Sequence, residues 1–272
     1  VVEDDGILYS YNSIKDRWLP ITKYNQNKPV TRIISLKESN VYFISDNLKE
    51  LNIETKEERD VFVDSMFFNT GISFEVFIKN LHDVIFDVTN NRFIIYPSFV
   101  SVDQSIFIFS LENKVLTTLP FNFFEDYFKL FNVTIADVNS DHIILKTFNS
   151  LVDYNFSKDI FNKLLPNFVS VAKIINNKVI TLNLALCEMR CDIKTLVSSS
   201  TVISLETNKI ESTASITGIT TNYYHIGSTT DDIYLFDYDY KDKNKGYKFD
   251  IVNNKLNLVD LNFPHEWTPQ EN

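Results

Sequence analysis

The sequence predicts a nearly all-β fold assembled from repeated hairpins. Runs of alternating or β-branched apolar residues, separated by polar turns, occupy most of the 272 residues, which is the pattern of antiparallel strands. Helical periodicity is rare by comparison. Two kinds of hairpin alternate along the chain, and each kind returns after roughly 40 to 50 residues. Strand content and this period together predict the architecture.

The first kind of hairpin has a short strand, a polar turn that often ends in Lys or Asp, a second strand and, in several copies, a closing Leu-Pro. The opening copy joins residues 7–11 to residues 18–20, and a weaker copy runs from residues 48–55 into residues 61–63. The other copies are at residues 106–120, 151–166, 202–210 and 247–256.

The second kind of hairpin falls between copies of the first. Its strands are short and β-branched, and two of its turns are Asn-Asn pairs. We expect such turns to close two-stranded antiparallel units. The copies join residues 32–36 to 41–44, 84–88 to 93–96, 134–138 to 143–145, 171–175 to 179–182, and 217–220 to 224–226.

Two interleaved hairpins in each period give four strands, which is the content of one β-propeller blade. The sequence therefore predicts an all-β fold, a β-propeller of five or six four-stranded blades with one or two short inserted helices. We expect a single domain at residues 1–261 and a C-terminal tail at residues 262–272. A pair of β-sandwiches or an irregular β domain is the alternative topology.

One blade is predicted to be incomplete. The chain opens directly on a hairpin of the first kind, and no partner hairpin precedes it. Residues 262–269 contain two prolines, and proline is poorly accommodated in a central strand. The missing strand is therefore expected from outside this sequence, from a strand that the pattern does not reveal, or from a partner chain that donates it.

The chain resembles the kelch and WD-repeat class of β-propellers. The resemblance is carried by the strand-turn-strand that ends in Trp18-Leu19-Pro20, which is similar to the kelch ending of an aromatic residue, two further residues and Leu-Pro. The resemblance extends over most of the chain, but the Gly-Gly pair of kelch repeats and the Gly-His and Trp-Asp pairs of WD repeats are absent. It implies a degenerate propeller and transfers no functional residue.

Composition excludes several function classes. A net charge of −10 opposes binding to nucleic acid or to anionic membranes without specificity, because both need a dense basic face. No apolar run approaches the roughly 18 residues of a membrane helix, so we expect no membrane insertion. The two cysteines, Cys187 and Cys191, cannot form a disulfide framework, and we expect an intracellular protein of the cytoplasm or nucleus.

The motifs of common active sites are missing. The sequence contains 5 glycines and has no phosphate-binding loop, nucleophile elbow or zinc-protease motif. His142 follows Asp141 and is expected to be a solvated turn residue. The acidic stretch at residues 237–246 does not have the spacing of a calcium loop. We therefore expect no enzyme, no cofactor and no metal.

Two aromatic segments are the candidate partner-binding residues. Residues 120–131 have helical periodicity and place Phe124 and Phe128 on one face. The alternative is that this helix packs on or between blades. Residues 182–196 are the candidate second helix. Tyrosine is favoured at binding surfaces, and three tyrosines in or beside a hairpin tip complete the candidates: Tyr238, Tyr240 and Tyr247.

The favoured function is a non-catalytic protein–protein interaction scaffold, a subunit or domain of a larger assembly. The alternative is a propeller that binds or hydrolyses a small ligand or glycan in its central funnel. A third reading is a structural fragment that completes a larger chain. Acidic residues near strand ends could supply the carboxylates of the alternative: Asp87, Asp137, Asp153, Asp237 and Asp250.

Overall fold

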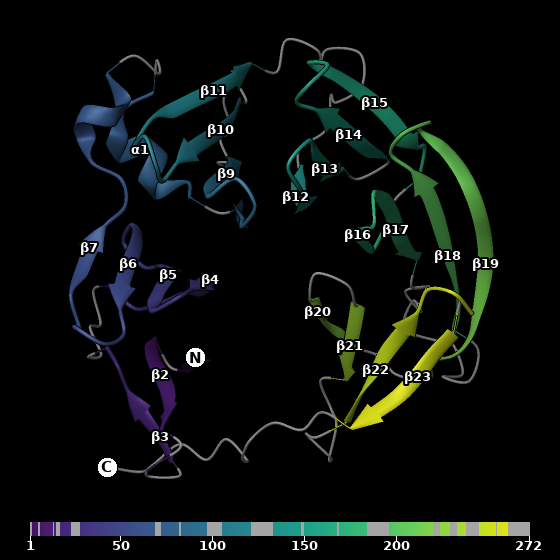
Figure 1. Cartoon of the computed structure of the whole chain (residues 1–272), viewed down its shortest axis with the longest axis horizontal. Helices are drawn as coiled ribbons and strands as arrows, with labels where there is room; N and C mark the ends of the chain where they lie inside the picture. Colours follow the sequence, from purple (N-terminus) through teal and green to yellow (C-terminus); the bar gives the residue numbers. More distant parts are fainter. Residues whose placement is uncertain are drawn as a thin grey trace. The chain divides into compact units, whose positions relative to one another are not determined.

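The computed structural model divides into two compact units, one within Val1–Glu125 and the other within Asp126–Glu266. Both are built of antiparallel sheets whose strands follow one another in chain order (Figure 1). No helix in the described part of the chain is long and apolar enough to cross a membrane. The described residues are 2–4, 6–12, 14, 17–22, 28–68, 72–81, 83–96, 105–120, 133–147, 150–167, 169–183, 196–219, 224–228, 233–237, 245–253 and 255–260.

The first unit contains three sheets. The first sheet is formed by β1 (Val2–Asp4), β2 (Ile7–Asn12) and β3 (Arg17–Pro20). The second is formed by β4 (Arg32–Lys37), β5 (Asn40–Ile44), β6 (Leu48–Asn52) and β7 (Glu58–Asp60). The third is formed by β8 (Asp83–Asp87), β9 (Arg92–Tyr96), β10 (Ser105–Ser110) and β11 (Leu116–Pro120).

The second unit contains three four-stranded sheets. The first is formed by β12 (Thr134–Val138), β13 (His142–Lys146), β14 (Leu151–Asn155) and β15 (Ile160–Leu165). The second is formed by β16 (Val171–Ile175), β17 (Lys178–Asn183), β18 (Leu196–Ser204) and β19 (Lys209–Ile219). The third is formed by β20 (Tyr224–Ser228), β21 (Ile233–Asp237), β22 (Lys245–Asp250) and β23 (Lys255–Asp260).

The sheets confirm the predicted all-β class of four-stranded repeats. The helices predicted at residues 120–131 and 182–196 fall largely outside the described residues, so they stay predictions. The helices that are described, α1 (Phe74–Lys79) and the 3₁₀ turn η1 (Asp64–Phe67), lie between β7 and β8. The strand expected at residues 61–63 lies earlier in the chain, at β7 (Glu58–Asp60). The side chains of Val61 and Phe62, which follow β7, are buried in the core.

The core lies between neighbouring sheets. In the first unit, side chains of the second sheet, the third sheet and the connection between them form one buried cluster. In the second unit, each pair of consecutive sheets shares a buried cluster. The first strands of neighbouring sheets contact each other, β4 with β8 and β12 with β16. Packing of consecutive four-stranded meanders face to face is the arrangement of propeller blades.

One turn geometry recurs between the third and fourth strands of the four-stranded sheets. The third strand always ends in Asn, Ser or Asp, whose side-chain oxygen accepts the backbone N–H three residues later. A short polar side chain thus stabilises the turn by mimicking a backbone bond. The pairs are Asn52 with Thr55 (2.9 Å), Ser110 with Asn113 (3.3 Å), Asn155 with Lys158 (2.9 Å), Ser204 with Thr207 (3.3 Å) and Asp250 with Asn253 (3.1 Å).

A second recurring bond ties this turn to the turn between the first two strands. The residue after the third strand donates its backbone N–H to a carbonyl oxygen of the earlier turn. The two turns of a blade are therefore held together as one unit. The donors and acceptors are Ile53 to Ser39 (2.8 Å), Leu111 to Asn91 (3.0 Å), Phe156 to Asp141 (2.8 Å) and Leu205 to Asn177 (3.2 Å).

The fifth residue of this turn adopts a left-handed backbone conformation. Glycine favours that conformation because it has no Cβ, but here non-glycine residues occupy the position. Their φ angles are 63° at Lys56, 56° at Lys114, 52° at Asp159 and 55° at Asn208. Each lysine or aspartate there stores local strain, since a left-handed L-residue costs roughly 1–2 kcal/mol.

Replacing Lys56 by glycine is expected to raise the free energy of unfolding by about 0.5–1 kcal/mol, because relief of the left-handed strain exceeds the added backbone entropy. The backbone N–H of residue 56 still donates to the Asn52 carbonyl oxygen in the variant. Urea unfolding measures the change. The neighbouring substitution Glu57→Gly is the control and should lower stability, because Glu57 does not have a positive φ. A loss of stability in Lys56→Gly would contradict the strain.

The three-stranded sheet corresponds to a blade without its first strand. Ile21 donates its N–H to the Leu8 carbonyl oxygen at 2.7 Å, as Val61 does to Leu48 at 2.8 Å in the second sheet. This match makes β2 and β3 the third and fourth strands of their blade, and β1 the second. The predicted incomplete blade thus gains one strand that the pattern did not reveal. Among the described strands, none occupies the place on the other side of β1.

Candidate protein-docking surface

The connection between β7 and β8 is anchored by buried phenylalanines. Phe62 lies 5.4 Å from Phe77 and 5.1 Å from Phe109, measured between ring centroids, and Phe77 lies 5.1 Å from Phe107. All three pairs meet edge to face, a favourable arrangement for aromatic rings. Because Phe107 and Phe109 belong to β10, these rings fix the connection to the third sheet, beside which α1 lies in Figure 1.

Polar contacts fix the backbone of the same connection. The Asn47 side-chain amide donates to the Phe62 carbonyl oxygen at 3.0 Å. The Ser73 hydroxyl accepts the Val76 N–H at 3.3 Å and begins α1 as an N-cap, a role that serine fills well. On the exposed side of α1, Lys79 pairs with Glu75 at 2.7 Å, one helical turn apart. These contacts anchor the described parts of the connection, residues 61–68 and 72–81.

Three apolar side chains of these anchored parts are exposed to solvent. Phe68 is 78% exposed, Val63 is 45% exposed and Val76 is 47% exposed. The adjacent Phe67 is only 4% exposed, so consecutive phenylalanines have opposite environments. Single exposed apolar residues are common on protein surfaces, whereas several in neighbouring segments are a candidate binding surface. We name Val63, Phe68 and Val76 the Phe68 surface.

An acidic strand edge leads into the Phe68 surface. All three residues of β7 are exposed, and β7 is the last strand of its sheet. The bonds from Val61 N–H to Leu48 and from Asn52 N–H to Glu57 set the alternation of the ladder. They direct the backbone groups of Arg59 toward β6 and those of Glu58 and Asp60 outward.

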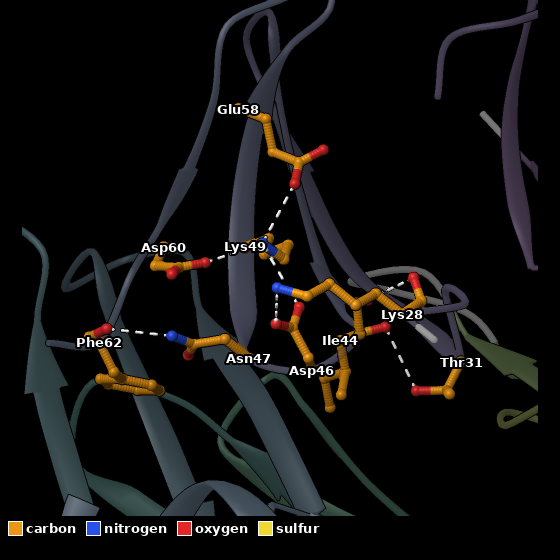
Figure 2. A network of polar contacts seen from close by, with 10 residues as sticks. Lys28, Thr31, Ile44, Asp46, Asn47, Lys49, Glu58, Asp60 and Phe62 are labelled. Carbon is orange, nitrogen blue, oxygen red and sulfur yellow. Dashed lines mark hydrogen bonds and ion pairs between the residues drawn. The ribbon is translucent and has the colours of Figure 1, made fainter. Parts of the chain in front are cut away.

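Lys49 holds the carboxylates of this edge in place (Figure 2). Its Nζ atom lies 2.8 Å from Asp60, 3.1 Å from Glu58 and 3.4 Å from Asp46, and Asp46 also pairs with Lys28 at 2.6 Å. Burial acts to lower the pKa of Lys49, but Asp60 and Glu58 outweigh it and hold that pKa above its usual value. Lys49 therefore stays charged and keeps both carboxylates of β7 at fixed positions.

On the opposite face of the same sheet, Glu50 neutralises the charge of Arg59. The Arg59 guanidinium donates to the buried Glu50 carboxylate through Nε and Nη2, both at 2.7 Å. Burial and the nearby Glu50 raise the pKa of Tyr42 to about 12, so its hydroxyl stays protonated and donates to Glu50 at 3.4 Å. The Arg59 charge is thus used within the sheet and does not offset the acidic edge.

The partner-binding residues predicted from sequence are largely outside the described residues. Phe124, Phe128, Tyr238 and Tyr240 fall in that group, and their role stays a prediction. Tyr247 lies in β22, opposite Leu258 of β23, and packs partly buried against the cluster that contains Phe249 and Ile233. The Phe68 surface was not predicted. A Ser73 cap followed by the Glu75 and Lys79 pair was the signal that could have indicated its helix.

Four of the five acids proposed for a ligand funnel have described side-chain partners. Asp87 pairs with Arg92 at 2.8 Å, and Asp137 pairs with Lys173 at 3.2 Å. Asp250 caps its turn, and Asp237 ends β21. The remaining acid, Asp153, is buried beside His142. Among the described residues, no group of three or more His, Cys, Asp and Glu side chains could hold a metal ion.

His142 is not the solvated turn residue that the sequence suggested. Asn139 accepts the backbone N–H of His142 at 2.8 Å, which closes the turn early and makes His142 the first residue of β13. Its ring is buried, with Nδ1 2.8 Å from Asp153 Oδ1. Burial raises the pKa of Asp153 despite this contact. The pair joins neighbouring strands β13 and β14 of one sheet.

The sequence matches no family model and no curated protein. Solved structures do share the fold. TolB from Acinetobacter baumannii superposes with a TM-score of 0.52 at 8% identity, over 95% of this chain and 60% of that chain. A chain of the Mitotic Checkpoint Complex gives 0.55 at 9% identity, over 95% and 72%. The WD40 domain of Neurospora crassa Pan2 gives 0.50 at 10% identity, over 86% and 66%.

Identities this low show the fold alone. This chain corresponds to 60% of the TolB chain, so it spans less than two thirds of that protein. The matched structures, together with consecutive four-stranded meanders, confirm the predicted class. The chain has a β-propeller fold built of degenerate, WD-repeat-like blades.

Proposed function

We propose that the protein is a non-catalytic protein-interaction module of a larger assembly and that it docks a partner through the Phe68 surface. The exposed Phe68 on a buried phenylalanine base is the observation that carries the proposal. One structure with a similar fold is a chain of the Mitotic Checkpoint Complex, itself a protein assembly. Because the chain has few cysteines, we place this role inside the cell, in the cytoplasm or nucleus.

The energetics of the Phe68 surface support docking. Phe68 has helical backbone angles (φ −54°, ψ −29°) directly after η1, so its direction is set by the same turn that buries Phe67. A backbone that already has its bound conformation loses little conformational entropy when a partner covers the side chain that it carries. Burying an aromatic side chain at the centre of an interface commonly contributes about 2 kcal/mol or more. The Phe68 surface is therefore suited to act as an anchor.

Removal of the Phe68 surface is expected to abolish partner binding without unfolding the protein. The test is purification of the tagged chain from its native cells with quantitative mass spectrometry of co-purifying proteins. Proteins recovered with the wild type should fall at least about tenfold with the double variant Phe68→Ser, Val76→Ser. Equal recovery with this variant and the wild type would contradict docking at this surface.

The matched control is Val252→Ser, which removes an exposed valine from the other unit. It should leave the recovered proteins unchanged. Urea unfolding should show all variants within about 0.5 kcal/mol of the wild type, since exposed substitutions seldom cost more.

The side of β1 that faces away from β2 is a second proposed contact site for a protein partner. A partner strand there would complete the blade by backbone pairing, as in strand addition to a sheet edge. In the purified complex, the amides of Val2–Asp4 should exchange hydrogen more slowly than in the free protein. Unchanged exchange would remove strand donation from the proposal. Phe124, Phe128, Tyr238, Tyr240 and Tyr247 stay candidates for further partner contacts.

A further inference from the structure

We infer that the Phe68 surface and the β7 edge together bind a basic partner segment, in which lysine or arginine side chains flank an apolar anchor. This inference rests on the proposed docking function and adds the chemistry of the partner. The anchor packs on Phe68, and the basic side chains pair with Glu58 and Asp60.

The β7 edge carries two exposed carboxylates. The side chains of Glu58 and Asp60 are 42% and 49% exposed, whereas Lys49 between them is only 12% exposed. One buried cation is thus shared by two outward carboxylates, while Asp46 is also neutralised by Lys28. Each carboxylate offers about four lone-pair sites and keeps acceptor capacity for a second donor. The edge therefore presents preorganised acceptors to solvent.

The segment from Asp46 to Lys79 is acidic overall, because its acidic side chains outnumber its basic ones. Of its four basic residues, Lys49 and Arg59 pair with acids of their own sheet and Lys79 pairs with Glu75. The fourth, Lys56, is exposed at the turn between β6 and β7. A positive partner gains from this field through faster association and correct orientation, and an acidic partner is repelled.

The acidic edge leads along the chain into the Phe68 surface. Val63 follows Asp60 by three residues, and the path between them is fixed by hydrogen bonds at Val61 and Phe62. Asp64 is exposed and begins η1, and in the sequence it lies between the β7 edge and Phe68. Because these parts follow one another along the chain, we expect a single partner segment to contact both the carboxylates and the Phe68 ring.

A charged edge strand alone has a simpler explanation. Short, charged edges protect proteins against unwanted strand pairing, and β7 fits that description. Protection does not explain why exposed Val63, Phe68 and Val76 follow immediately. Those side chains would favour association unless a partner covers them. The acidic sign of the surface also argues against nucleic acid or anionic lipid, which leaves a basic protein segment.

Fluorescence anisotropy of labelled peptides at 0.15 M NaCl tests the inference. The probes are a 12-residue peptide of lysines around a central Leu-Phe-Leu, the same peptide with glutamates in place of lysines, and a peptide of lysines and serines only. We expect the first to bind the wild-type chain at least tenfold more tightly than the other two. Equal binding of the glutamate peptide would overturn the inference.

The decisive variant is Glu58→Gln with Asp60→Asn, which removes charge with little change in shape. It should weaken the first peptide at least tenfold. The control, Glu112→Gln with Glu206→Gln, makes the same charge change at exposed turns elsewhere and should change binding less than twofold. If both double variants weakened binding of the first peptide equally, the peptide would be attracted by the net charge of the chain alone. That result would overturn the inference.

Native partners separate this inference from the proposed function. The double variant Phe68→Ser, Val76→Ser tests docking, and the double variant Glu58→Gln, Asp60→Asn tests the basic character of the partner. If only the first variant releases the co-purifying proteins, the docking function is supported and the inference of a basic partner is wrong. If neither variant releases them, both proposals fail. Release by both variants, with the control variants unchanged, supports both.

Discussion

Replacing Phe77 by alanine is expected to lower the free energy of unfolding of the first unit by about 3–5 kcal/mol. The Phe77 side chain has no solvent exposure, and its ring lies 4.7 Å from Phe67, 5.4 Å from Phe62 and 5.1 Å from Phe107. These neighbours belong to the connection and to β10, so they cannot collapse together into the vacated space. The cavity therefore adds its cost to the lost burial of the ring.

Hydrogen exchange measured by mass spectrometry checks the location of this effect. Peptides from residues 61–120 should exchange faster in Phe77→Ala, and peptides from residues 171–205 should not change, because they belong to the other unit. The neighbouring exposed substitution Val76→Ala is the control and should cost less than about 0.5 kcal/mol. Uniform acceleration across both units would contradict a local core.

Replacing Asp137 by valine is expected to cost about 2–3 kcal/mol, because one carboxylate satisfies two groups of the next sheet. Asp137 Oδ2 accepts the Ile174 N–H at 2.7 Å and lies 3.2 Å from Lys173 Nζ. Valine leaves this buried N–H without its acceptor. Asp137→Asn keeps an acceptor and should cost much less, which urea unfolding at pH 7 would show. Equal losses for both substitutions would contradict the role of the N–H.

The pH dependence of Asp137 gives an independent check. Burial raises the pKa of Asp137 above its ordinary 3.8, although Lys173 and the Ile174 N–H oppose the rise. The folded state then binds this proton more tightly than the unfolded state, so the contribution is greatest at acid pH and is lost as pH rises through the folded pKa. The wild type should therefore gain stability relative to Asp137→Asn between pH 7 and pH 4.

The sequence predicted the strands and turns because their causes are local. A turn capped by Asn52 and closed by Lys56 uses hydrogen bonds within five residues, so alternation and turn chemistry were enough to find it. The pairing of hairpins into four-stranded sheets followed from the period. The first sheet was harder to predict, because β1 has only three residues. So short a strand shows too little alternation of apolar and polar residues to be detected.

The docking surface could not be predicted because tertiary contacts decide it. Phe67 and Phe68 are the same residue type, and only the packing of Phe67 against Phe74 and Phe77 determines which ring is buried. The edge position of β7 likewise depends on pairing with β6. The neighbours of His142 in the sequence are polar and suggested an exposed turn residue. The turn bond to Asn139 and the contact with Asp153 on the neighbouring strand place its ring in the interior instead.

The recurring turn cap also explains how this chain can preserve a repeat while losing its sequence signature. The cap needs only a side-chain oxygen at the last residue of the third strand, and Asn, Ser and Asp all supply it. The left-handed position accepts Lys, Asp and Asn in place of glycine, although each carries local strain. Mutations can therefore exchange these residues without loss of the fold, and drift erases the glycine motifs by which repeat families are ordinarily recognised. Distant relatives of this chain should share the spacing of these oxygen atoms more faithfully than any residue identity.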